Sequence, residues 1–119
     1  MLIRYKQSYE KIAMGLLSFM PGEENLKQLQ STMHEYETNE HWRLFLWKDD
    51  DITGIIGIRI IDEDTAEVQH LSVNPSHRGQ GLGKRMIQQL KDMLREEYEL
   101  VPNKKLKGFF ENCGFDDAQ

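Results

Sequence analysis

Three glycines lie at alternate positions in the stretch RGQGLG, between a run that alternates like a β-strand and a run with helical periodicity. Gly79, Gly81 and Gly83 would let the backbone turn sharply and approach a ligand without a Cβ in the way. The first-turn amides of the following helix lack partners within it, and the helix dipole places about half a positive charge there. A strand, a glycine turn and a helix start therefore predict an anion site that suits a phosphate.

The spacing within this loop excludes two familiar phosphate loops. The P-loop requires Ser or Thr after its Gly-Lys pair, whereas Arg85 follows Gly83 and Lys84. The dinucleotide fingerprint requires G-x-G-x-x-G and an opening βαβ unit, and the sequence has neither. The loop does contain R-x-x-G-x-G, formed by Arg78, Gly81 and Gly83. Arg78, Lys84 and Lys104 could add positive charge beside phosphates, and each is equally compatible with a solvated surface position.

Two residues before the loop could take a proton from a substrate. Glu67 lies six residues before Val73 and His70 lies three before it, which places them on opposite pleats of a regular strand. A general base works best with a pKa near neutrality, where imidazole titrates without help. The structural alternatives are a solvated strand carboxylate and a surface or half-buried histidine. The sequence leaves the choice between them open.

Composition narrows the class of protein. A chain of 119 residues with 39% hydrophobic and 29% charged residues indicates one soluble domain, residues 1–119. The net charge of −5 argues against broad nucleic-acid binding, and no apolar run approaches the ~20 residues that cross a bilayer. The single cysteine excludes disulfide frameworks and cysteine-rich zinc sites. We therefore expect a cytoplasmic protein with no leader, no metal and no membrane or nucleic-acid partner.

The elements that must position these residues follow from the hydrophobic periodicity. It predicts strands at 2–5, 43–47, 52–60, 66–73 and 98–101, and helices at 8–20, 23–37, 83–97 and 104–113. The three middle strands are joined by short acidic turns and are expected to be antiparallel. Gly114 would end the last helix. The order β-α-α-β-β-β-α-β-α indicates an α/β fold on a largely antiparallel sheet.

In this context the sequence resembles the GNAT superfamily of acetyl-CoA-dependent N-acetyltransferases. The segment LSVNPSHRGQGLGKRMIQQL is similar to their strand-loop-helix core, and VPNKKLKGFFENCGF is similar to the motif that follows it, V-x-x-x-N…FYEKxGF. The opening LIRYKQSYEKIAMGLLSFMP most resembles a small subgroup, the RibT-type proteins encoded beside riboflavin-synthesis enzymes. The resemblance covers nearly the whole chain and implies a GNAT-like fold.

The resemblance also implies a cofactor, acetyl-CoA, and a way of holding it. Backbone amides of the glycine loop would surround the pyrophosphate, and the strand before the loop would splay from the next strand and bind the pantetheine arm. One amide of that strand would polarise the thioester carbonyl. Leu71 and Val73 alternate along this strand, so their side chains are expected to face the core. The implied cofactor-binding residues are Leu71, Val73, Arg78, Gly79, Gly81, Gly83, Lys84, Asn103 and Phe110.

Two departures from the family pattern bear on activity. Phe110 stands where the family often has a tyrosine that protonates the departing thiolate, so that proton must come from solvent or from another group such as Tyr98. Phe110 could still pack against pantetheine, and Asn103 could bond the cofactor or merely cap a helix. The chain also lacks the two further strands that usually follow, and an exposed sheet edge makes a homodimer one expectation.

Two functions are therefore compatible with the sequence. The first is an enzyme that moves an acetyl group to a primary amine, of a small molecule or of a protein, in one ternary complex. Glu67, or His70 through water, would take the proton. The amine would enter from the side of the first two helices. The second is a catalytically weak CoA-binding module that acts as a sensor or partner of other enzymes. A glycine turn that binds no cofactor is a third and weaker possibility.

Overall fold

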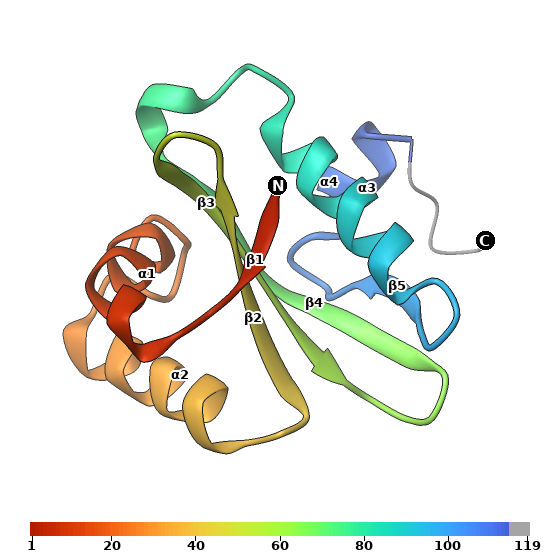
Figure 1. Ribbon diagram of the computed structural model, residues 1–119, viewed down its shortest axis with the longest axis horizontal. Coiled ribbons are helices and arrows are strands. Elements are labelled where there is room, and N and C mark those ends of the chain that lie inside the picture. Colours follow the sequence, from red (N-terminus) through yellow and green to blue (C-terminus); the bar gives the residue numbers. More distant parts are fainter. Residues whose placement is uncertain (115–119) are drawn as a thin grey trace.

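Five β-strands form one mixed sheet, and their order in the sheet follows their order in the chain (Figure 1). This computed structural model describes residues 1–114 of the 119-residue chain. The strands are β1 (Leu2–Arg4), β2 (Trp42–Lys48), β3 (Ile52–Ile60), β4 (Thr65–Val73) and β5 (Glu99–Pro102). Neighbouring strands are antiparallel from β1 to β4, whereas β5 runs parallel to β4.

Helices lie on both faces of the sheet (Figure 1). One face is covered by α1 (Glu10–Leu17) and α2 (Leu26–Thr38), and the other by α3 (Leu82–Leu94) and α4 (Lys107–Asn112). Short 3-10 turns lie at Gln7–Tyr9 and Pro75–His77. The predicted order of elements and the α/β fold on a largely antiparallel sheet are confirmed.

The helix ends differ slightly from the predicted ones. α3 stops at Leu94 because the amides of Glu97 and Tyr98 both bond the Leu94 carbonyl at 2.8 Å and turn the chain toward β5. Gly114 does end α4, with a positive φ of 83° that favours glycine. Within residues 1–114, no helix combines the length and apolar character needed to cross a bilayer.

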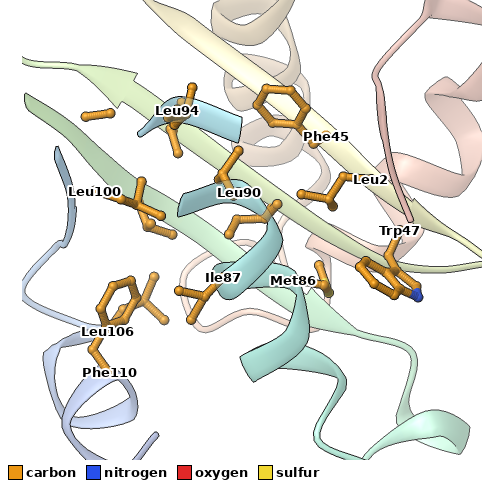
Figure 2. Close-up of a cluster of buried hydrophobic side chains, with 14 of the residues drawn as sticks. Leu2, Phe45, Trp47, Met86, Ile87, Leu90, Leu94, Leu100, Leu106 and Phe110 are labelled. Carbon is orange, nitrogen blue, oxygen red and sulfur yellow. The ribbon is translucent and has the colours of Figure 1, made fainter. Parts of the chain in front are cut away.

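The core on the α3 side fixes the start of that helix against the end of β4 (Figure 2). Met86, Ile87 and Leu90 of α3 are fully buried, and Phe110 of α4 packs beside them. Burying each such side chain stabilises the fold by about 1.5–3 kcal/mol. The loop between β4 and α3 is therefore fixed at both ends, because the strand before it and the helix after it are packed into this core.

The core on the α1 and α2 side fixes the connection between those two helices. Leu17 of α1 and Ile55 of β3 are fully buried in it, and Tyr36 of α2 contacts Trp42 edge-on, with ring centroids 5.2 Å apart. Asn25 caps α2, because its side-chain oxygen accepts hydrogen bonds from two first-turn amides at 2.8 and 3.2 Å. The residues between Leu17 and Asn25 are thus held at both ends.

β4 and β5 separate halfway along β4. Their pairing runs from Thr65 opposite Glu99 to Val68 opposite Pro102, and one further bond joins the Asn103 amide to the Val68 carbonyl at 3.2 Å. Beyond Val68, β4 continues for five residues without a strand beside it on that edge in the described part of the chain. The splayed strand implied by the family resemblance is therefore present.

Candidate active site

A cavity of about 850 Å³ opens where β4 leaves β5, between the glycine loop, α4 and the end of α1. Its walls come from five segments of the chain. The lining residues are Phe19, Met20, Pro21, Leu71, Ser72, Val73, His77, Arg78, Gly79, Gly81, Leu82, Gly83, Lys84, Lys105, Leu106, Phe109 and Cys113. Seven of the predicted site residues, from Leu71 to Lys84, are among them.

The glycine loop needs its glycines for two different reasons. Gly79 and Gly81 have φ values of +83° and +71°, which other residues rarely adopt. Gly83 has ordinary backbone geometry, but a Cβ there would lie 2.9 Å from Cζ of Phe109. Gly81 is the N-cap of α3, so the open amides of the first helical turn face the loop. This geometry suits an anion.

Arg78 is held in place beside this loop. Its Nε donates to the Val73 carbonyl at 3.2 Å, and its guanidinium lies over the ring of Phe19, 5.8 Å from the centroid. Lys84 and Lys105 also line the cavity. Three cationic side chains therefore surround a space whose floor is apolar. Among residues 1–114, no three His, Cys, Asp or Glu side chains group closely enough to hold a metal ion.

The unpaired part of β4 presents backbone to the cavity. Leu71 and Val73 pack against the α3-side core, as predicted, and both also line the cavity. The Leu71 amide donates to Sδ of Met20 at 3.2 Å. A thioether is a weak acceptor, so this amide can exchange it for a stronger one.

A β-bulge corrects the predicted arrangement of Glu67 and His70. Gly57 of β3 lies opposite His70, whereas the next residue, Ile58, lies opposite Val68, so Gln69 is an extra residue in β4. The extra residue reverses the alternation, and Glu67 and His70 lie on the same face of the sheet rather than on opposite pleats. That face is the one covered by α1 and α2.

His70 belongs to a small buried polar cluster. Its Nδ1 lies 2.5 Å from the Tyr36 hydroxyl, and its Nε2 lies 3.4 Å from Oε1 of Glu23. Burial, and secondarily the positive charge of Lys105, lowers the pKa of His70 to about 4. Burial and the charge of Glu23 raise the pKa of the Tyr36 hydroxyl well above its usual value. At neutral pH both His70 and Tyr36 are therefore uncharged.

Neither Glu67 nor His70 is among the residues that line the cavity, but only His70 belongs to this cluster. Glu67 pairs in register with Arg59 and Val101, where β4 and β5 are still joined, and it accepts a hydrogen bond from Nε2 of Gln69 at 2.6 Å. Leu71 lies three register steps further along β4, or about 10 Å along a strand, because Gln69 is the extra residue of the bulge. The structure thus brings His70, and not Glu67, next to the unpaired segment.

The structure places Phe110 in the core, away from the cavity in which the sequence predicts its contact with the cofactor. Phe110 is 1% exposed and packs under α3, where Figure 2 shows it beside Leu106 and Ile87. The neighbouring residue, Phe109, lines the cavity instead. In a helix, consecutive residues point in directions about 100° apart, so only one of the two can face the core squarely. Sequence similarity to the family motif could not show which one.

Asn103 and Tyr98 also serve other purposes. The Asn103 side chain accepts a hydrogen bond from the Leu106 amide at 3.0 Å and so caps a turn. It also donates to the carbonyl of Gln69, the bulge residue, at 3.3 Å and so stabilises the bulge. It does not line the cavity, which favours the structural role over a bond to the cofactor. Tyr98 lines a separate depression with Arg43 over its ring, and it cannot protonate a group in the main cavity.

Four further residues of the site carried no motif in the sequence. Met20 and Lys105 line the cavity, and Glu23 and Tyr36 surround His70. Only the position of Glu23 just after Pro21 and Gly22, in the turn between two predicted helices, hinted that its side chain was not part of a helical face. Their grouping depends on tertiary contacts across four elements.

The fold is shared with solved acetyltransferase structures. The structure matches AAC(6')-Iy, solved in complex with a CoA-linked bisubstrate analogue, with a TM-score of 0.75 and 16% identity over 100% of this chain and 92% of that one. It also matches a GNAT family acetyltransferase from Elizabethkingia anophelis with acetyl-CoA bound, with a TM-score of 0.72 and 17% identity over 97% and 73% of the two chains. The fold is that of the GNAT acetyltransferases.

Sequence comparison establishes the family itself. The profile of the Acetyltransferase (GNAT) family matches residues 10–115, and the chain belongs to this family. It is also 55% identical, over 114 residues, to an uncharacterized N-acetyltransferase in the lysA 3' region of Bacillus methanolicus, a match that covers 95% of this chain and 94% of that relative.

Proposed function

We propose that the protein transfers the acetyl group of acetyl-CoA to a primary amine by direct attack in a ternary complex. One observation carries this proposal: the Leu71 amide, on the part of β4 that has no strand beside it, and the glycine loop open onto the same cavity. Membership of the GNAT family supports acetyl transfer in general. The fold shared with a protein that has acetyl-CoA bound supports the choice of donor.

The donor would lie along the cavity from the loop to the Met20 side chain. The amides of Gly79, Gly81, Gly83 and Lys84 would surround the pyrophosphate, and the open edge of β4 would bond the pantetheine arm as an added strand does. At its inner end the thioester carbonyl oxygen would replace the Met20 sulfur on the Leu71 amide. A fixed backbone dipole at this point stabilises the charge that develops on the oxygen during attack.

His70 is the better placed of the two candidate bases. It directly precedes Leu71, and the described residues form no hydrogen bond to its Nε2. Its lowered pKa keeps the imidazole neutral, so Nε2 can accept a proton from the attacking amine when Nδ1 keeps its own proton against the Tyr36 hydroxyl oxygen. As the amine nitrogen bonds the carbonyl carbon, the C–S bond breaks and the thiolate takes a proton from solvent.

A melting experiment with three glycine variants tests donor binding. We expect acetyl-CoA at about a hundred times its Kd to stabilise the wild type by roughly 2.7 kcal/mol. Gly81→Glu places a carboxylate at the anion site and should abolish this stabilisation. Gly81→Ala separates backbone strain from charge, and Gly108→Glu is the control, because Gly108 lies outside the cavity lining and a Cβ there meets nothing within 4 Å.

The result decides between three outcomes. Stabilisation of the wild type and of Gly108→Glu, but not of Gly81→Glu, supports the donor site. Equal stabilisation of Gly81→Glu places the pyrophosphate elsewhere. A wild type that acetyl-CoA does not stabilise means that the loop is only a turn, and the proposed donor would be wrong.

The second candidate function is a CoA-binding module with little chemistry. The absence of a tyrosine hydroxyl from the cavity lining favours it, since Phe109 and not a proton donor occupies that wall. Donor binding with no acetylation of any amine would identify this function. The narrower resemblance to RibT-type proteins, and with it a link to riboflavin metabolism, stays a prediction.

A further inference from the structure

A buried carboxylate faces the candidate base. Glu23 lies in the connection between α1 and α2 and is only 5% exposed. Its Oε1 accepts a hydrogen bond from the Thr32 hydroxyl at 2.5 Å and lies 3.4 Å from Nε2 of His70. Its other oxygen, Oε2, accepts no hydrogen bond from residues 1–114. Oε2 therefore keeps its capacity to accept a hydrogen bond from a ligand.

Glu23 also lacks a permanently charged partner. His70 is neutral at ordinary pH, and neither Lys nor Arg lies within 4.0 Å of the carboxylate in the described part of the chain. Lys105 comes near: its Nζ lies 3.4 Å from the position that a Cβ on Gly22 would take, and its charge acts on His70. Burying a carboxylate without a bonded cation is costly, so the site favours a cation that brings its own donors.

We propose that Glu23 binds the acceptor amine as its ammonium ion and holds it against Nε2 of His70. This inference rests on the proposed acetyl transfer and adds to it the residue that selects the acceptor. An ammonium group has three donors, and the gap of 3.4 Å between Oε1 and Nε2 offers it two acceptors at once. The substrate class that follows is a cationic alkylamine rather than an uncharged arylamine or an alcohol.

The same arrangement lets a proton of the bound ammonium pass to Nε2 of His70. One N–H bond of the ammonium breaks and an Nε2–H bond forms, which leaves a neutral amine with a free electron pair and an imidazolium beside Glu23. The total charge in the site does not change. The carboxylate stabilises the imidazolium, which burial and Lys105 disfavour, and the Tyr36 hydroxyl accepts from Nδ1 throughout. After the neutral amine attacks and the C–S bond breaks, the nitrogen releases its second proton to solvent, from which the thiolate takes one, and the imidazolium then returns its proton to solvent. Glu23 is a substrate-binding residue in this sequence, and His70 takes the first proton.

The charged and titratable groups around the base come from four elements. Tyr36 projects from α2, His70 from β4, Glu23 from the connection between α1 and α2, and Lys105 from the connection between β5 and α4. Glu67 shares the face of His70 but is bonded to Gln69. Glu23 is the carboxylate that contacts the imidazole, so removing its charge should change both amine affinity and the pH profile.

The test replaces Glu23 by glutamine, which keeps the shape and can still accept from Thr32. With acetyl-CoA and a panel of primary alkylamines, we expect Glu23→Gln to lower kcat/KM by about 10- to 100-fold, mostly through KM. The acid limb of the pH profile, which reflects protonation of His70, should shift to lower pH because the imidazolium loses the carboxylate that stabilises it. Glu24→Gln is the matched control, because Glu24 is the exposed neighbour and bonds only the Gly22 amide. Stabilisation by acetyl-CoA should be the same in all three proteins.

A binding measurement keeps the inference separate from turnover. With CoA at saturation, propylamine should raise the melting temperature of the wild type, while propan-1-ol, which has the same carbon chain and no charge, should not. The shift should vanish in Glu23→Gln and persist in Glu24→Gln. Thr32→Val, which leaves the carboxylate but frees Oε1, should weaken the amine effect and serves if Glu23→Gln fails to fold.

The outcomes distinguish this inference from the proposed function. Amine acetylation that Glu23→Gln leaves within about twofold of wild type overturns the role of Glu23 and preserves the acetyltransferase. Amine binding that depends on Glu23 without any acetylation supports the cation site and overturns the proposed transfer. A wild type that no alkylamine stabilises at millimolar concentration overturns the inference.

Discussion

At His70, two requirements oppose each other within one side chain. A base must be uncharged before it accepts a proton, and burial under α2 keeps it so. The imidazolium that follows must then exist in the same buried place. The contact with Glu23 reconciles the two, because a carboxylate at 3.4 Å contributes little while the ring is neutral and stabilises it once it is charged.

The lowered pKa of His70 predicts a stability that depends on pH. An unfolded histidine has a pKa of 6.5 and His70 has about 4, so between these values the unfolded chain binds more protons. The free energy of unfolding should therefore fall as the pH drops from 6.5 toward 4, by about 3 kcal/mol in total from this residue. Urea unfolding of His70→Gln across this range should show a smaller loss than wild type.

Exposed His41 provides the control for this measurement. His41→Gln should leave the pH dependence of unfolding unchanged, because His41 is exposed and lies outside the buried cluster around His70. A His70→Gln protein that loses as much stability in acid as wild type would show that the folded state does not suppress protonation at this position.

The sequence identified some residues of the site and missed others for a physical reason. The sequence alone identifies Arg78, Gly79 and Gly81, because a local motif and the start of a helix lie in one short stretch. Glu23 and Tyr36 come from segments 47 and 34 positions before His70 and meet it only after the helices pack. Nothing in their local sequence separates them from ordinary residues of amphipathic helices.

At the scale of elements, α4 decides which of two adjacent phenylalanines reaches the cavity. We expect Phe110→Tyr to leave turnover unchanged and to cost about 1–3 kcal/mol of stability, because the added hydroxyl would be buried in an apolar core. Phe109→Tyr is the matched control: it places the same hydroxyl at the cavity wall, with little cost in stability. Acetylation rates and urea unfolding of both variants test this.

A rise in acetylation rate in Phe110→Tyr would contradict the packing described for α4. It would mean that residue 110 turns toward the thioester, as the tyrosine of the related motif implies. The motif identified the correct helix, but the six residues of α4 are too short to fix its rotation from periodicity alone.

The bulge in β4 is a second feature that the sequence did not predict. Alternation along AEVQHLSV predicts a regular strand, and the pairing with β3 shows one extra residue. Gly57 of β3 lies opposite His70, where a Cβ would lie 2.0 Å from the Tyr36 hydroxyl oxygen. The absence of a side chain at this position makes room for the tyrosine beside the histidine. The sequence feature that accompanies the bulge is therefore a glycine in β3, and not a residue of β4 itself.

At the scale of the whole molecule, α1 and α2 lie on one face of the sheet and α3 and α4 on the other (Figure 1). The cavity for the donor lies between the glycine loop, α4 and the residues that follow α1, and the polar cluster for the acceptor lies on the α1 and α2 face. Element order and the two-sided sheet followed from periodicity because long amphipathic helices and alternating strands are strong signals. The parting of β4 from β5 came only from the family resemblance, since nothing in β4 itself marks where pairing stops.

The outer edge of β5 gives a prediction about assembly. Among residues 1–114 no strand pairs with that edge, and open edges attract further strands. We expect a homodimer, which light scattering would report as about 28 kDa, twice the 14.0 kDa of one chain. A mass of 14.0 kDa would contradict it, and would show that a four-residue strand ending at Pro102 is short enough to remain unpaired.

The bulge at Gln69 also limits how this protein can diverge. Loss of a single codon between Val68 and Leu71 would restore a regular strand and move either the imidazole or the donor-binding backbone to the wrong side of the sheet. Gain of a codon would also shift the register by one residue and move one of these two groups to the wrong side of the sheet. Relatives that keep this chemistry are therefore expected to vary in this strand by substitution and to conserve its length.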